Sequence, residues 1–329
     1  MGGALQAMLM PAEGTYTKDF TGFDAPEPNS LLLIRRVGLR AADPGRAGRF
    51  LVDALGARGV QGSPSVSAEV GATVFDVLPV ASGEEAKPWP GQFYVWVHNI
   101  QETWAACKSF QAKVKEEVIL EALCLKEETK VDALLVRDPA SGALFMVNQA
   151  PKGYTKIAAA AGLLREEQHS NALAVMDVRR LVPPGCAEKL AAFYKNELAA
   201  SVRLEDGAYR VRLAMGTAVR QTLTFQDDAD LAEGGAAAPL DALTITMPSQ
   251  DAFASCRGRL GAEAEEGAAG ELRVARCLGS APRGDELRLE HVLLAPSRTG
   301  AMPTPVDRQA KVAGEAKPGG AGDDAWLGA

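Results

Sequence analysis

Histidine is scarce in this chain, which has only three histidines in 329 residues. Aromatic residues make up 6% of the chain, and no apolar run approaches the roughly 18 residues that a membrane-spanning helix needs. The chain also lacks an excess of basic residues, since its formal net charge is -7. A nucleic-acid-binding face needs such an excess. We therefore expect a globular protein with a largely aliphatic core, no membrane span and no nucleic-acid partner.

Paired cysteines are missing as well. The five cysteines are odd in number, form no CxxC pair and have no neighbouring histidines at zinc spacing. The start of the chain shows no apolar stretch followed by a small-residue cleavage site. We therefore expect an intracellular protein in a reducing compartment.

A unit made of a strand, a helix and further strands occurs four times along the chain. The expected strand and helix pairs are 31–39 with 45–55, 93–97 with a helix starting at Asn99, a strand near Ala172 with 186–198, and 240–247 with a helix from Pro248 to Leu260. Hairpins are expected at 133–137 with 144–147 and at 209–213 with 219–225, and a last strand at 287–294. An internal repeat of this kind outweighs local propensity as evidence for a fold.

The four units suggest two homologous domains, each formed by consecutive units. The expected organisation is an extended arm at 1–29, a first domain at 30–150, a partly helical linker at 151–170, a second domain at 171–297 and a poorly ordered tail at 298–329.

An aromatic cluster stands out in a chain so poor in aromatics. On the strand at 93–97, Phe93, Val95 and Val97 alternate with Tyr94 and Trp96, so the two sets face opposite sides of a sheet. One set is expected to pack under a helix. The other lines a cleft or forms a contact surface for a protein or a pigment.

At this point the chain resembles the vicinal oxygen chelate superfamily, which includes glyoxalase I, bleomycin-resistance proteins and extradiol dioxygenases. The resemblance covers about residues 31–296 and rests on Arg36-Val37-Gly38-Leu39 with Asp43 and the helix to Phe50, on Gly91 to Ile100, on Asp138-Pro139 through Gly142, and on Ala187 to Leu198. The stretches 182–185, 221–225 and 289–291 look most like a glyoxalase-like branch known from bacteria, photosynthetic ones included.

The resemblance implies an α+β fold in which four βαβββ modules pair into two domains, each with a curved eight-stranded sheet around a cleft. In family enzymes the cleft binds Fe, Mn, Zn or Ni through His, Gln or Glu side chains on the first and last strands of the modules, and an open coordination position receives the substrate.

In the first domain, this pattern places Arg36 at the first ligand position, Gln92 at the second and Met146 at or beside the closing one. A guanidinium cannot coordinate a cation. Arg36 and Gln92 are therefore candidates for an anion or carboxylate pocket. The alternative is that Arg36 points to solvent or pairs with an acid.

In the second domain, Asp177 falls near the first ligand position, Asp241 beside the second, and Glu290 or His291 at the closing strand. These four residues are the candidate metal ligands. Glu290 and His291 cannot both face one cleft without a bulge, because adjacent strand residues point to opposite faces.

Two functions follow from the resemblance and its departures. The first is a protein that has lost its metal, needs no cofactor and acts as a binding or structural subunit of a larger assembly, with protein partners and with a small-molecule ligand as a further candidate. The branch resemblance places that assembly in a plastid, with the cytoplasm as the alternative. The second is a metal-dependent lyase, isomerase or dioxygenase with Glu290 as ligand and proton acceptor. The sequence leaves the oligomeric state open.

Overall fold

The computed structural model describes most of the four units and their connections. The described ranges are 32–60, 66–80, 89–124, 130–160, 164, 170–213, 221–232, 240–261, 264–267, 270–280 and 286–296. The predicted arm at 1–29 and tail at 298–329 lie outside these residues.

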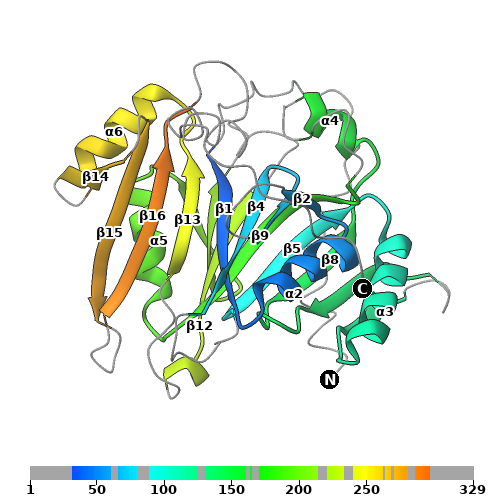
Figure 1. The fold of residues 1–329 in the computed structure, drawn as a ribbon. Helices are drawn as coiled ribbons and strands as arrows, with labels where there is room; N and C mark the ends of the chain where they lie inside the picture. The colour runs from blue at the N-terminus through cyan, green and yellow to red at the C-terminus, as the bar shows by residue number, and fades with distance from the viewer. Residues whose placement is uncertain are drawn as a thin grey trace, which may run out of the picture.

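Each unit consists of a strand, a helix and three further strands, which confirms the predicted repeat (Figure 1). Unit 1 contains β1 (Leu33–Ala41), α2 (Pro44–Arg49) continued by the π-helical η1 (Phe50–Ala54), β2 (Arg58–Val60), β3 (Val66–Val70) and β4 (Thr73–Pro79). Unit 2 contains β5 (Gly91–Val97), α3 (Ile100–Val114), β6 (Ile119–Leu123), β7 (Ala133–Arg137) and β8 (Leu144–Gln149).

Units 3 and 4 follow the short helix α4 (Tyr154–Ala160), which lies in the predicted linker. Unit 3 contains β9 (Ala172–Val182), α5 (Ala187–Asn196), β10 (Ser201–Glu205), β11 (Ala208–Leu213), β12 (Gln221–Asp227) and the 3-10 turn η2 (Asp230–Ala232). Unit 4 contains β13 (Leu240–Thr246), α6 (Gln250–Leu260), β14 (Ala264–Glu266), β15 (Glu271–Ser280) and β16 (Glu286–Leu294). None of the helices in the described ranges is long and apolar enough to cross a membrane.

Capping residues fix where three of these helices begin. Asp43 accepts a hydrogen bond from Arg46 N at 2.9 Å, and Pro44 occupies the first turn of α2. Asn99 accepts from Gln101 N at 3.1 Å at the start of α3. Ser249 accepts from Ala252 N at 3.0 Å at the start of α6. These polar residues lie two or three positions after the end of a strand, so units 1, 2 and 4 turn from strand to helix at a sequence signal.

The strands form two eight-stranded sheets, but consecutive units do not share a sheet. Sheet A has the order β14-β15-β16-β13-β1-β4-β3-β2 and combines units 4 and 1, and sheet B has the order β10-β11-β12-β9-β5-β8-β7-β6 and combines units 3 and 2. The units meet where β1 pairs antiparallel with β13 and where β5 pairs antiparallel with β9. The predicted α+β fold with four βαβββ modules is confirmed. The predicted pairing of consecutive units is wrong. Unit 1 pairs with unit 4 and unit 2 with unit 3, because tertiary packing and not chain order decides which first strands lie side by side.

Helices and aromatic side chains fill the space between the sheets. Phe75 of sheet A lies 5.1 Å from Phe93 of sheet B, measured between ring centroids. Phe193 and Tyr194 on α5 contact His291 of β16 and Phe225 of β12, at centroid distances of 6.1 and 5.6 Å respectively. Figure 1 accordingly shows α5 behind β16 and β13. The face of each sheet that is turned toward this core is its inner face, and the opposite one is called the outer face below.

Gln221 joins the two sheets where both carry an irregularity. Its Oε1 accepts from the amide of Ile34 at 2.7 Å, and its Nε2 donates to Thr73 Oγ1 and to Val175 O, each at 3.2 Å. The register of β1 shifts at Ile34/Arg36, and that between β5 and β9 shifts at the pair of Tyr94 with Asp177. The buried side-chain amide of Gln221 therefore hydrogen-bonds backbone groups that the bulges expose.

The alternation predicted for β5 is confirmed. Phe93, Val95 and Val97 lie in the core on the inner face. Trp96 lies on the outer face and packs edge to face on Tyr154 of α4, with ring centroids 5.0 Å apart. Tyr94 lies next to it on the same face. The outer face of sheet B is thus partly covered at one end and carries Tyr94 near its middle.

Candidate functional site

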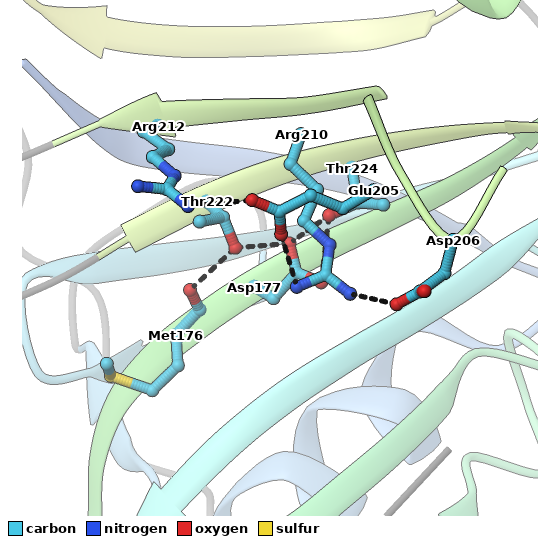
Figure 2. A network of polar contacts seen from close by, with 8 residues as sticks. All are labelled: Met176, Asp177, Glu205, Asp206, Arg210, Arg212, Thr222 and Thr224. Atoms are coloured by element: carbon cyan, nitrogen blue, oxygen red, sulfur yellow. Dashed lines mark hydrogen bonds and ion pairs between the residues drawn. The ribbon is translucent and has the colours of Figure 1, made fainter. Parts of the chain in front are cut away.

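The outer face of sheet B carries a buried polar network around Asp177. Val178 is fully buried in the core, so Asp177 beside it on β9 faces outward. Thr222 Oγ1 donates to Asp177 Oδ1 at 2.6 Å, and Thr224 Oγ1 lies 2.9 Å from Oδ1 and 3.1 Å from Oδ2 (Figure 2). The two threonines are two residues apart on β12 and therefore share this face. Together they hold the carboxyl group in one orientation.

Burial changes the acidity of this carboxyl group. It raises the pKa of Asp177 above the ordinary aspartate value, while the two threonine hydroxyls, Arg179 and Arg210 each lower it. Desolvation is the larger effect. Asp177 therefore keeps its proton to a higher pH than a solvated aspartate does, and can act as a hydrogen-bond donor or acceptor.

Two arginines on β11 form the next layer of the network. Arg212 and Arg210 pair in register with Thr222 and Thr224. Glu205 of β10 receives Arg212 Nη2 at 2.8 Å and Arg210 Nη1 at 3.2 Å (Figure 2). These side chains are about a quarter to a third exposed, so the ion pairs mainly orient the guanidinium groups rather than stabilise the fold strongly.

Arg179 and Gln92 lie directly opposite each other where β9 meets β5. Arg179 Nε and Gln92 Nε2 are buried and have no hydrogen-bond partner among the described residues. The Arg179 guanidinium carbon lies 6.0 Å from the centroid of the Tyr94 ring. The outer face thus presents two side-chain donors without acceptors, next to an aromatic ring.

The corresponding place on sheet A is occupied by an ion pair. Arg36 Nη1 lies 2.5 Å from Asp76 Oδ2, and Ser67 Oγ donates to Asp76 Oδ1 at 2.7 Å. The register shift in β1 turns Arg35 to this face as well, where its Nε donates to Thr246 Oγ1 at 3.0 Å. Burial lowers the pKa of Arg35 to about 10. This face is therefore positively charged at the strand where the resemblance expects a first metal ligand.

The structure does not bring Arg36 and Gln92 together, because they lie in sheets A and B respectively. The anion pocket predicted from these two residues is therefore not formed as a pair. Arg36 instead pairs with an acid, which was the alternative left open by the sequence. Gln92 faces Arg179 across the strand pair.

The four candidate metal ligands are also divided between the sheets. Asp177 lies in sheet B, whereas Asp241, Glu290 and His291 belong to β13 and β16 of sheet A. The side chains of Asp241 and Glu290 lie outside the described residues. His291 is buried on the inner face, where it hydrogen-bonds Tyr194 Oη. His291 therefore packs in the core rather than toward the outer face.

The described side chains on the outer faces offer few ligands for the metal that the resemblance implies. No group of three or more His, Cys, Asp or Glu side chains that could hold a metal ion occurs in the part of the chain that the structure describes. Around Asp177 the neighbouring oxygens belong to threonine hydroxyls that donate to it, and the neighbouring charges are those of Arg179 and Arg210. A divalent cation needs several oxygen or nitrogen ligands, which guanidinium groups cannot supply.

The residues that sequence reasoning missed follow a simple pattern. Arg210 and Arg212 are separated by one residue, as are Thr222 and Thr224, and Asp177 and Arg179. Polar side chains at i and i+2 of a strand share a face. That alternation could have indicated a polar outer face on three adjacent strands of unit 3.

Comparisons with known proteins agree on the fold. No protein-family model matches the chain, and no curated protein matches it. A putative dioxygenase from Bacillus subtilis aligns with a TM-score of 0.50 and 12% identity over 87% of this chain and 96% of that chain. Glyoxalase I from Zea mays aligns with a TM-score of 0.48 and 13% identity over 80% of this chain and 92% of that chain. The likeness to the Bacillus subtilis structure, at 12% identity, concerns the fold alone, and this fold is glyoxalase-like.

Proposed function

We propose that this protein is a binding or structural subunit with a glyoxalase-like fold that works without a catalytic metal. The observation that supports this is the ion pair between Arg36 and Asp76, at 2.5 Å, on the strand where a first metal ligand is expected. A cation placed there would be repelled by Arg36 and would compete with it for Asp76. Because Arg36 and Asp76 already neutralise each other, this position on β1 does not favour a metal.

The equivalent strand of unit 3 supports the same proposal. Thr222 and Thr224 already donate to Asp177, the candidate carboxylate of this strand, and Arg179 and Arg210 lie near enough to lower its pKa. A metal would have to displace Thr222 and Thr224 and approach Arg179 and Arg210. The outer face of sheet B is instead suited to a ligand that carries its own negative charge.

Elemental analysis and activity assays test this proposal. The full chain, purified without added metal and then again after incubation with Fe(II), Mn(II), Zn(II) or Ni(II), should hold no stoichiometric metal after gel filtration. It should turn over neither a glutathione hemithioacetal nor a catechol. One retained equivalent per chain that Glu290→Ala or Asp177→Asn abolishes would contradict the proposal and favour the metal-dependent lyase or dioxygenase.

The proposal extends to a larger assembly, with a plastid as its expected location. Its support is the sequence resemblance together with the Gly- and Pro-containing stretches at 1–29 and 298–329, which a compact enzyme would not need. In native gels of a cell extract the protein should migrate with a large complex, and deletion of residues 1–29 should release it. Migration of the full chain as a free monomer or dimer would argue against this role.

A further inference from the structure

Two donors without acceptors lie side by side on the outer face of sheet B. Gln92 is 8% exposed, and its Nε2 has no partner among the described residues. Arg179 Nε has none either, and the two residues are directly opposite each other on β5 and β9. Native proteins rarely leave buried donors unsatisfied, because each costs about 1–3 kcal/mol. Such a pair indicates an acceptor that the described residues do not provide.

The side chains around these two donors differ between the two sides of β5. On the β9 side lie Asp177, Arg179 and the arginines of β11. On the β8 side Tyr94 pairs with Met146, which packs with Ala133, Leu123 and Leu135 in an apolar cluster. One half of the face is therefore charged and the other apolar, and Tyr94 lies at the boundary.

We infer that the outer face of sheet B binds an organic carboxylate with an apolar body, whose carboxylate contacts Arg179 and Gln92 and whose body lies over Tyr94 and the Met146 cluster. This inference rests on the proposed metal-free function and names the ligand class for it. Arginine is suited to planar carboxylates because its nitrogens form parallel hydrogen bonds. In the apolar half, Met146 is only 1% exposed, and it is the partly buried Tyr94, Leu123 and Leu135 that supply area for the body of the ligand.

The neighbouring charges favour a single negative charge over a dianion. Asp177 lies close enough to Arg179 and Tyr94 for their charges to influence one another. Arg210 and Arg212 are already engaged by Glu205. A phosphate dianion would gain one free guanidinium and meet the carboxyl group of Asp177, whereas a monoanionic carboxylate balances Arg179 alone.

Calorimetric titration of the full chain with octanoate tests the inference, with octanamide, acetate and inorganic phosphate as comparison ligands. We expect saturable binding of octanoate, and at least about tenfold weaker binding of octanamide, which lacks the charge. Acetate lacks the apolar body and should bind more weakly than octanoate as well. Phosphate binding tighter than octanoate, or acetate binding equal to it, would overturn the inference.

Substitutions on the same face locate the site. Arg179→Gln should weaken octanoate binding about tenfold or more, and Gln92→Leu about threefold or more. Arg203→Gln is the matched control, since Arg203 is an exposed arginine on β10, three strands from β9 in the sheet order, and should leave the affinity within about twofold. Arg179→Lys, which keeps the charge but loses the Nε donor, should give a smaller loss and replaces Arg179→Gln should the latter not fold. Unchanged binding by either folded Arg179 variant would overturn the site.

The titrations are run on protein dialysed against EDTA, with the metal content measured in the same sample. Failure of octanoate to bind this metal-free protein overturns the carboxylate site and leaves the metal-free function standing. Stoichiometric metal in the undialysed protein contradicts the metal-free function, whatever octanoate does.

Discussion

Replacement of Gln221 by leucine removes the polar contact that joins the two sheets. Gln221 is 3% exposed and makes three hydrogen bonds, to the amide of Ile34, to Thr73 Oγ1 and to Val175 O. Leucine has a similar volume, so the change removes the hydrogen bonds without opening a large cavity. The variant therefore isolates the polar contribution of this side chain to the packing of unit 3 on unit 1.

The expected cost follows from the partners that lose their hydrogen bonds. A buried donor or acceptor left without a partner costs about 1–3 kcal/mol. The amide of Ile34 lies in a bulge and loses an acceptor at 2.7 Å, while the carbonyl of Val175 loses a donor at 3.2 Å. Thr73 Oγ1 still donates to the carbonyl of Ile34. We therefore expect Gln221→Leu to lower the free energy of unfolding by about 3–5 kcal/mol.

Urea unfolding followed by intrinsic tryptophan fluorescence measures this change. Gln226→Leu is the matched control, because Gln226 lies on the same strand, is only partly buried and makes no side-chain hydrogen bond among the described residues. Its free energy of unfolding should change by less than about 1 kcal/mol. A loss below about 1 kcal/mol for Gln221→Leu, or an equal loss for both variants, would refute the reasoning.

Three further substitutions test other parts of the structure. Because burial raises the pKa of Asp177, the native state holds this proton more tightly than the unfolded chain, so the wild type should lose stability relative to Asp177→Asn as pH rises above about 4. Urea unfolding between pH 4 and 8 checks this, and a pH-independent difference would contradict it. Tyr194→Phe removes the hydrogen bond to buried His291 and should lower the free energy of unfolding by about 1–3 kcal/mol in the same assay; an unchanged free energy of unfolding would contradict this. Gly71→Ala should lower the thermal midpoint markedly, since φ is +59° and a Cβ would lie 2.0 Å from Leu173 O; an unchanged midpoint would contradict this.

The local elements were predictable because their signals are local. The strand around Phe93 to Val97 alternates between two faces, and the helix after it is capped by Asn99, as the sequence indicates. The turn at Asp138 closes the hairpin of β7 and β8, since its carboxylate accepts from Ala140 N at 3.0 Å. Periodicity and capping chemistry therefore specified strands, helices and hairpins without knowledge of the tertiary contacts.

The pairing of units was not predictable from these signals. All four first strands have an apolar inner face, so this face does not distinguish one partner from another. Contacts between units are not local either: Gln221 bonds unit 3 to Ile34 and Thr73 of unit 1, which lies in the other sheet. The strand pairing also determines which residues surround Asp177. Asp177 was separated from Asp241 and Glu290 and came to lie with Thr222 and Thr224 of its own unit. A side chain's partners across a sheet follow the strand order, which no local pattern encodes.

Titration of the full chain with Mn(II), followed by electron paramagnetic resonance, tests the central claim that the protein works without a metal. Manganese prefers oxygen ligands, so the cysteines do not compete for it. The account predicts that the signal of free aqueous Mn(II) rises in proportion to the added metal from the first addition. Loss of the signal up to one equivalent per chain, restored by Asp177→Asn or Glu290→Ala, would contradict it.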